Sequence, residues 1–196
     1  MMESEREMTE FSAETERVLR SAGWEPDRTV DTSLWRQRLE ESGFRMHDAA
    51  ERFLSEFGGL TVEISGPGVS RARVPFELDP MLADGEEDRF SEWSESIGES
   101  LFPLGELDRG RFFLGISESG KVYLVADWLA SFGPSREALE RLVRGIAPDE
   151  LPEQLGVKGS QVQILSSRPA FSQVVGRFHR EVGAALTRFP GLVSAL

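Results

Sequence analysis

Residues 49–60, Ala-Ala-Glu-Arg-Phe-Leu-Ser-Glu-Phe-Gly-Gly-Leu, change structural period part-way along the stretch. Up to Phe57 the apolar residues recur at the three- and four-residue spacing that lines one face of a helix. Gly58 and Gly59 end that pattern, because a glycine just past a helix adopts the left-handed conformation without a Cβ penalty. Residues 60–64 then alternate apolar and polar, which is the period of a strand. The stretch predicts a helix that leads directly into a sheet.

Composition narrows the class of protein. The chain has 196 residues and no cysteine, which excludes a disulfide scaffold, a cysteine zinc site and a thiol nucleophile. No apolar run approaches the roughly 18 residues that a membrane span needs, and the first residues are acidic where a signal peptide is basic and then apolar. We therefore expect a soluble, cytoplasmic protein that does not interact with membranes.

Charge is distributed unevenly along the chain. There are 34 acidic and 22 basic residues, for a net charge of −12. Residues 156–196 contain five basic residues and one acidic residue, so this tail carries +4 and residues 1–155 carry −16. A negative field repels nucleic acid and speeds encounter with basic partners. The same charge also keeps a protein soluble, so it does not by itself require a partner.

Further helices are predicted on both sides of the opening stretch. A helical stripe over residues 11–22 ends at Gly23, and Trp24 is expected to fold back onto that helix. Asp31 or Thr32 can cap a second helix that reaches Gly43. The apolar positions of this second helix are Leu34, Trp35 and Leu39. His47 opens the helix of the opening stretch, where a capping or solvated role is expected. Residues 134–145 predict a further helix, which is capped by Gly145.

The strand signals predict a mainly antiparallel sheet. Residues 71–78 are the expected partner of 60–64, with Pro75 at an edge or bulge. Residues 101–106 predict a short strand with a turn. Residues 111–116 and 121–126 predict a hairpin whose arms are apolar on both faces, so we place it at the centre of the sheet. Residues 127–129 lead toward the helix predicted at 134–145, and no strand is predicted there.

The end of the chain is expected to form an extension. Pro148 to Pro152 is interpreted as a linker, Val162 to Leu165 as a short strand, and residues 170–188 as a basic amphipathic helix. We accordingly divide the chain into an α+β domain over residues 1–150 and a C-terminal extension over residues 151–196. The extension is expected to pack on the same domain.

The survey finds no catalytic constellation. His47 and His179 are the only histidines, and the phosphate-loop, dinucleotide, nucleophile-elbow and zinc-protease motifs are absent. Carboxylate pairs alone can serve as catalysts, but no pair is singled out among 34 acids. We therefore expect a protein that is not an enzyme and that binds no cofactor or metal.

The densest acidic cluster lies between Asp79 and Glu92 and leads into an amphipathic segment ending near Ile97. Its spacing does not match a calcium-binding loop. A solvated loop or an acidic contact patch fits it better. The candidate partner-binding residues are Asp84, Glu86, Glu87, Asp88, Phe90 and Trp93, with Phe90 or Trp93 as an aromatic anchor.

Five short patterns occur in order along the chain: Ala22-Gly23-Trp24 with Arg28, Phe53 to Leu60, Leu-Phe-Pro-Leu-Gly-Glu at 101–106, Gly120 to Tyr123, and Leu139 to Gly145. Together they resemble the SUKH superfamily, and specifically its SUKH-3 branch, over residues 11–146. The resemblance implies a SUKH-like α+β fold with helices around a central, mostly antiparallel sheet. It also implies that the motif residues determine the fold and do not contact a partner, namely Trp24, Gly58, Gly59, Pro103, Gly105 and Gly120.

The resemblance further implies an immunity protein that binds and blocks a cognate toxin, often a nuclease or deaminase, without chemistry of its own. Such toxins present basic grooves, which an acidic inhibitor can cover by charge complementarity. Reversing Glu86, Glu87 and Asp88 to lysine should then slow association. A general interaction or scaffold module is the alternative, and an enzyme that uses carboxylates alone ranks last.

Overall fold

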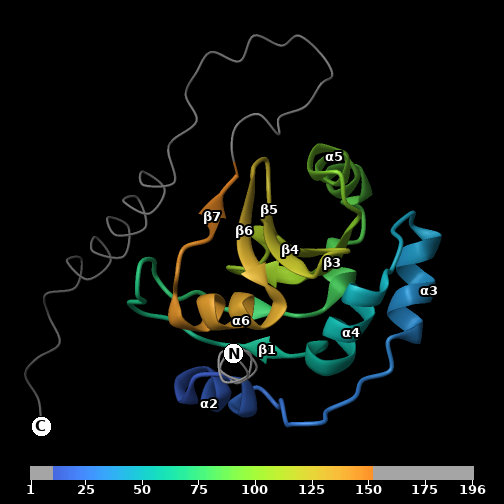
Figure 1. Ribbon diagram of the computed structural model, residues 1–196. Helices are drawn as coiled ribbons and strands as arrows, with labels where there is room; N and C mark the ends of the chain where they lie inside the picture. Colours follow the sequence, from blue (N-terminus) through green and yellow to red (C-terminus); the bar gives the residue numbers. More distant parts are fainter. Residues whose placement is uncertain (1–10, 152–196) are drawn as a thin grey trace, which may run out of the picture. The chain divides into compact units, whose positions relative to one another are not determined.

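A computed structural model describes residues 11–151 of the chain (Figure 1). The strand predicted at 162–165, the helix predicted at 170–188 and the proposed C-terminal extension lie outside the described residues. Within residues 11–151 the predicted α+β class is confirmed, with five α-helices and one sheet of seven strands.

The sheet is an antiparallel meander in which every strand pairs with the next one along the chain. Its strands are β1 (Thr61–Val62), β2 (Phe76–Glu77), β3 (Leu101–Leu107), β4 (Phe112–Ser117), β5 (Lys121–Val125), β6 (Leu129–Pro134) and β7 (Asp149–Glu150). The predicted hairpin is confirmed as β4 and β5, and β4 is the middle strand. Residues 114–117 and 122–125 are all buried, so both faces of the hairpin are covered.

Several strand predictions were wrong in detail. Residues 129–134 form β6, which was missed because Gly133 and Pro134 interrupt its pattern and its pairing with β5 shifts near Val122. The predicted linker at 148–152 contains β7, which pairs with β6, although both of its side chains are exposed and acidic. Residues 101–106 contain no turn; β3 runs straight through with a bulge between Pro103 and Gly105.

The helices follow the predicted order. They are α2 (Ala13–Ser21), α3 (Ser33–Glu41), α4 (Asp48–Phe57), the short 3-10 helix η1 (Pro80–Ala83), α5 (Glu87–Ile97) and α6 (Ser135–Arg144). In α4 the five apolar residues of the opening stretch are all buried. His47 caps α4, because its Nδ1 accepts a hydrogen bond from the Ala50 N–H. Leu34 of α3 is a correction, since 64% of it is exposed although it was assigned to the apolar face.

The two glycines after α4 play different parts. Gly59 has the left-handed conformation, with φ of 75°, whereas Gly58 does not. Gly58 is needed for space, because a Cβ there would lie 2.6 Å from the Trp35 ring. The Arg28 guanidinium donates to the carbonyl oxygens of Glu56 and Gly58 at 2.9 and 2.8 Å, which satisfies backbone groups at the end of α4.

An aromatic cluster joins three helices that lie together on one side of the sheet in Figure 1, namely α2, α4 and α6. Trp24 is 6% exposed, stacks on Phe57 with ring centroids 6.2 Å apart, and meets the Phe11 ring edge-on at 5.5 Å. The Arg136 guanidinium of α6 lies 4.9 Å from the centroid of Phe11. Trp24 thus folds back onto α2 as predicted.

Two other glycines lie where the local backbone favours a residue without a Cβ. Gly105 has φ of 148° in the β3 bulge, and a Cβ there would overlap the carbonyl oxygen of Glu77 on β2. Gly120 has φ of 82° and closes the turn of the β4–β5 hairpin. Gly105 thus has no room for a side chain, whereas at Gly120 the left-handed conformation alone favours glycine.

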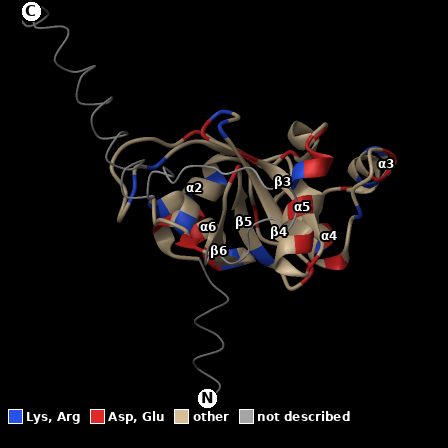
Figure 2. Ribbon diagram, turned by 90° about the horizontal axis from the view of Figure 1, so that it is seen from above, with Lys and Arg blue, Asp and Glu red and all other residues tan. Residues whose placement is uncertain are grey.

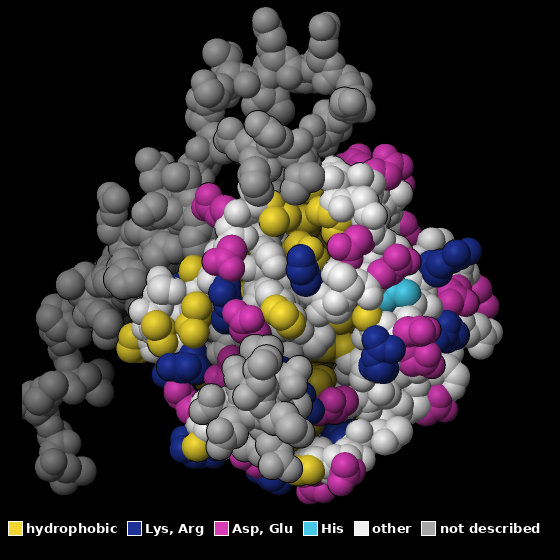
Figure 3. Space-filling model, in the orientation of Figure 1, with side chains coloured by type: hydrophobic (Ala, Val, Ile, Leu, Met, Phe, Trp, Pro, Cys, Tyr) yellow, Lys and Arg dark blue, Asp and Glu magenta, His cyan; other side chains and the backbone are white. Residues whose placement is uncertain are grey.

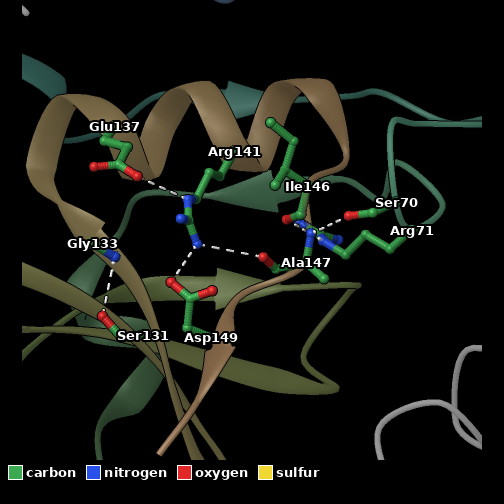
Figure 4. A network of polar contacts seen from close by, with 9 residues as sticks. All are labelled: Ser70, Arg71, Ser131, Gly133, Glu137, Arg141, Ile146, Ala147 and Asp149. Atoms are coloured by element: carbon green, nitrogen blue, oxygen red, sulfur yellow. Dashed lines mark hydrogen bonds and ion pairs between the residues drawn. The ribbon is translucent and has the colours of Figure 1, made fainter.

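The end of α6 is tied to its surroundings by polar contacts (Figure 4). Arg141 donates to Glu137 within the helix at 3.0 Å and to Asp149 of β7 at 2.9 Å. The loop at 66–73 binds the same end, because the N–H groups of Val69 and Ser70 donate to the carbonyl oxygens of Arg144 and Gly145. These contacts satisfy the last carbonyl groups of the helix.

Candidate partner-binding surface

Helix α5 carries the acidic cluster and is fixed to the sheet by its inner face. Phe90 is 1% exposed and meets Phe44 edge-on at 5.5 Å. A Cβ on Gly115 of β4 would lie 2.9 Å from the Phe90 ring, so the ring occupies the space that this glycine leaves open. Gly98 ends α5 in the left-handed conformation, with φ of 71°. The Ser94 hydroxyl then accepts a hydrogen bond from the Leu101 N–H at the start of β3.

The outer face of α5 carries a stripe of negatively charged side chains. Asp88, Glu92 and Glu95 are exposed and lie at helical spacings of four and three residues, which places them on the same face. Between residues 77 and 99 there are nine acidic residues and one basic residue, so this segment alone carries −8. Figure 2 shows the acidic segments of α5, and Figure 3 shows acidic side chains gathered over it at the upper right.

The single basic residue of the segment, Arg89, links α5 to a turn of the sheet. Its Nε donates to Glu86 at 2.6 Å, and its Nη1 donates to Asp127 at 2.8 Å. Asp127 lies in the turn between β5 and β6, and 95% of its side chain is exposed. The hydrogen bond to Glu86, more than any other contact, raises the pKa of Arg89. This link was not predicted, because 38 residues separate its ends.

Two further acids of the predicted set, Asp84 and Glu87, and the nearby Asp79 accept hydrogen bonds within the protein. Asp84 accepts a hydrogen bond from the Ser42 hydroxyl beyond the end of α3, at 3.0 Å. Glu87 accepts from the Gly85 N–H at 3.0 Å. Asp79 accepts from the Met81 N–H and so caps η1. Glu87 thus holds the turn that precedes α5, whereas Asp79 caps η1 and Asp84 contacts the residue after α3.

The two aromatic candidates differ in exposure. Phe90 is a correction, because a side chain that is 1% exposed belongs to the core and offers nothing to a partner. Trp93 is half-buried, and its indole N–H donates to the carbonyl oxygen of Ala126 at 3.0 Å. Trp93 and Arg89 are four residues apart, so both lie on the flank of α5 that faces the β5–β6 turn.

Among residues 11–151, no group of three histidine or acidic side chains is close enough to hold a metal ion. None of the helices in that part of the chain is long and apolar enough to span a membrane.

The comparison with protein families covers nearly all of the described residues. The family model of the SUKH-3 immunity proteins matches residues 11–145, which is more than half of the chain. The chain belongs to the SUKH-3 immunity protein family. Membership implies an immunity role in which a toxin is neutralised, and SUKH-3 immunity proteins are non-catalytic. No curated protein and no solved structure matches the chain significantly.

Proposed function

We propose that this SUKH-3 protein neutralises a basic toxin, of the nuclease or deaminase type, by binding it stoichiometrically through the outer face of α5. The observation that carries the proposal is the segment from residue 77 to residue 99, whose charge is −8 and whose exposed stripe lies on a rigidly seated helix. Enzymes that handle nucleic acid bind phosphates with lysine and arginine, so their binding grooves are electropositive. An acidic face complements such a groove and speeds encounter with it.

The charge pattern of α5 supports a role outside the fold. Like charges at three- and four-residue spacings destabilise a helix by about 0.2–0.5 kcal/mol per pair. Exposed helices elsewhere in this protein pair opposite charges at that spacing, as Glu16 does with Arg20 and Arg36 with Glu40. The stripe on α5 therefore costs stability, and a contact with a basic partner offsets that cost.

The direct test is growth rescue. The chain is co-expressed with the toxin domain encoded beside its gene, and binding of an inactivated form of that domain is measured at low and high salt. The variant Asp88→Lys/Glu92→Lys/Glu95→Lys reverses the exposed stripe and leaves Glu86 and Glu87 in place, since these two carboxylates hold the start of α5. We expect association at low salt to fall by about tenfold or more and its salt dependence to flatten.

A matched control makes the same change in net charge elsewhere. Glu16→Lys/Glu25→Lys/Glu63→Lys alters three carboxylates on α2, the turn after it and the residue after β1. These positions bring six units of positive charge without touching α5. If both triple variants slow association equally, net charge alone is responsible and the α5 assignment fails. Unimpaired rescue by the α5 variant, with association unchanged at low salt, would also refute the α5 assignment.

Failure to bind the toxin would favour the alternative function, that of a general interaction module. If the neighbouring toxin domain is neither bound nor neutralised by the unaltered chain, the immunity mechanism proposed here is wrong for that toxin. Capture of several unrelated proteins by the same α5 face would then favour a general interaction module.

A further inference from the structure

The surface beside the acidic stripe contains features that charge alone does not explain. The turn between β5 and β6 is attached to α5 by two separate contacts. Arg89 donates to Asp127 at 2.8 Å, and the Trp93 indole N–H donates to the Ala126 carbonyl at 3.0 Å. Asp127 is nevertheless 95% exposed in its side chain, so the contact with Arg89 fixes a carboxylate that remains open to solvent.

We propose that the toxin-binding surface is composite, with Trp93 and the β5–β6 turn at its core and the acidic stripe of α5 along its rim. This inference rests on the proposed function and extends it to a second element of the fold. Its partner is the basic toxin, and the contact combines a tryptophan anchor with the acidic stripe beside it.

Trp93 has the properties of an interface anchor. Tryptophan is strongly enriched among the residues that dominate binding energies, since it covers a large area with few rotatable bonds. The ring is half-buried, and its N–H is already bonded to Ala126, so the side chain is held in one orientation. A pre-ordered side chain loses little conformational entropy on binding. In the free protein Trp93 also satisfies its own donor, which a core tryptophan such as Trp24 does not.

Arg89 acts here as a positioning residue. It is the one basic residue between positions 77 and 99, and it would oppose a basic partner if it were free. Both of its contacts are with carboxylates, on Glu86 of the same segment and on Asp127 of the turn. Its charge is therefore neutralised locally, and its fork holds the turn against α5. The toxin meets the far sides of these carboxylates.

The geometry of α5 makes the surface continuous. Successive residues of a helix are separated by 100°, so Arg89 and Trp93 lie next to Asp88 and Glu92 around the helix axis. The first pair faces the β5–β6 turn, and the second pair is the exposed stripe. A partner that covers the stripe and the turn together must cover Trp93 between them.

The test uses the full chain and the inactivated toxin domain encoded beside its gene. Trp93→Ala should weaken equilibrium binding by about 30-fold or more, mainly through faster dissociation. Trp93→Phe keeps a ring but loses the bond to Ala126, so its loss should be smaller. Asp127→Arg should slow association at low salt by about tenfold. Glu118→Arg is the matched control, because Glu118 is an exposed acid in the β4–β5 turn, at the opposite end of β5 from Asp127, and should change association less than about twofold.

The outcomes separate this inference from the proposal beneath it. If the stripe variant loses binding while Trp93→Ala and Asp127→Arg bind normally, the surface ends at α5 and the composite surface is refuted, with the proposed function intact. If the unaltered chain does not bind the toxin, both fail. Thermal unfolding of each variant is recorded alongside. Asp127→Arg decides the matter should Trp93→Ala not fold, because the ion pair with Arg89 positions the turn but, being exposed to solvent, contributes little to stability.

Discussion

Helices α5 and α6 have nearly the same length and the same kind of left-handed glycine cap, but the charged residues are distributed differently along them. In α6, Glu137 lies in the first turn and Arg141 and Arg144 in the last, which suits the helix dipole. Glu137 also pairs with Arg141 at four-residue spacing. In α5 the first turn is acidic and the last turn has no basic residue to balance Glu95. The acidic first turn of α5 also suits the helix dipole, but Glu95 in its last turn and the like charges along its stripe work against the fold, whereas the whole pattern on α6 serves it.

Sequences that specify a fold are locally consistent, and departures concentrate at functional sites. The inner face of α5 obeys the rules of a core helix, and only the outer face departs from them. The inner face of α5 is therefore structural, whereas the fold does not require the outer face.

The largest effect should come from the inner face of α5. Phe90→Ala removes a side chain that is 1% exposed and leaves a cavity beside Gly115 and Phe44. We expect a loss of about 3–5 kcal/mol in the free energy of unfolding, comparable with the about 2–5 kcal/mol expected for Leu139→Ala in α6. Urea denaturation of both variants measures this. A loss below about 1 kcal/mol for Phe90→Ala would mean that α5 is not seated as described.

The next effect concerns an acid of α6 that supports the fold. The Glu140 carboxylate accepts hydrogen bonds from the hydroxyl groups of Ser12 and Thr15 and from the Ser12 N–H at the start of α2. Thr15 is fully buried, so Glu140→Ala leaves its hydroxyl without this acceptor and should cost about 1–3 kcal/mol. Asp88→Ala on α5 is the control and should change stability by less than about 0.5 kcal/mol. Equal losses in thermal unfolding would erase the distinction between the two acids.

The parts of the fold that the sequence alone could predict are those defined by short stretches of chain. Helix α4 was predicted nearly to the residue, because its apolar spacing and the two glycines after it report the same boundary. The β4–β5 hairpin was placed correctly, because arms apolar on both faces have only the centre of a sheet to occupy. These features depend on short stretches of chain, in which period and turn residues are sufficient evidence.

Features that depend on distant residues were missed. Strand β7 consists of Asp149 and Glu150, and only pairing with β6 makes these two acids a strand. The turn at Asp127 meets Arg89 across 38 positions of sequence, which no local pattern reports. Within the acidic cluster, composition marked the segment but not which side chains are exposed. Phe90 and Trp93 both belong to the apolar side of the predicted amphipathic segment. Packing against Gly115 makes Phe90 the buried one of the two.

A third helix provides a pH-dependent reference for the comparison. His47 accepts from the Ala50 N–H with Nδ1, and its Nε2 lies 3.2 Å from the Ile116 carbonyl, to which it donates. Burial lowers the pKa of His47 below its usual value of 6.5. The folded state thus binds the proton less well than the unfolded state, so stability should decline as pH falls below about 6.5 and level off below the lowered pKa.

Two variants of His47 isolate this contribution. His47→Ala should cost about 1 kcal/mol at pH 7 through loss of the cap, and His47→Asn should restore most of it because asparagine caps well. The asparagine variant should also lose the decline in stability below pH 6.5, measured by urea denaturation. An undiminished decline in this variant would assign it to other groups.

The smallest effect tests the comparison most directly, because stability and binding should move in opposite directions. Glu95→Lys places a cation in the last turn of α5, three residues from Glu92, where it favours both the helix dipole and a side-chain pair. We expect the free protein to gain about 0.3–1 kcal/mol, seen as a raised melting temperature, while association with the basic toxin domain slows at low salt. Arg144→Glu makes the converse change in the last turn of α6 and should lower stability by a similar amount without slowing association. If Glu95→Lys stabilises the protein and binds unimpaired, the outer face of α5 is neither needed by the fold nor used by the toxin.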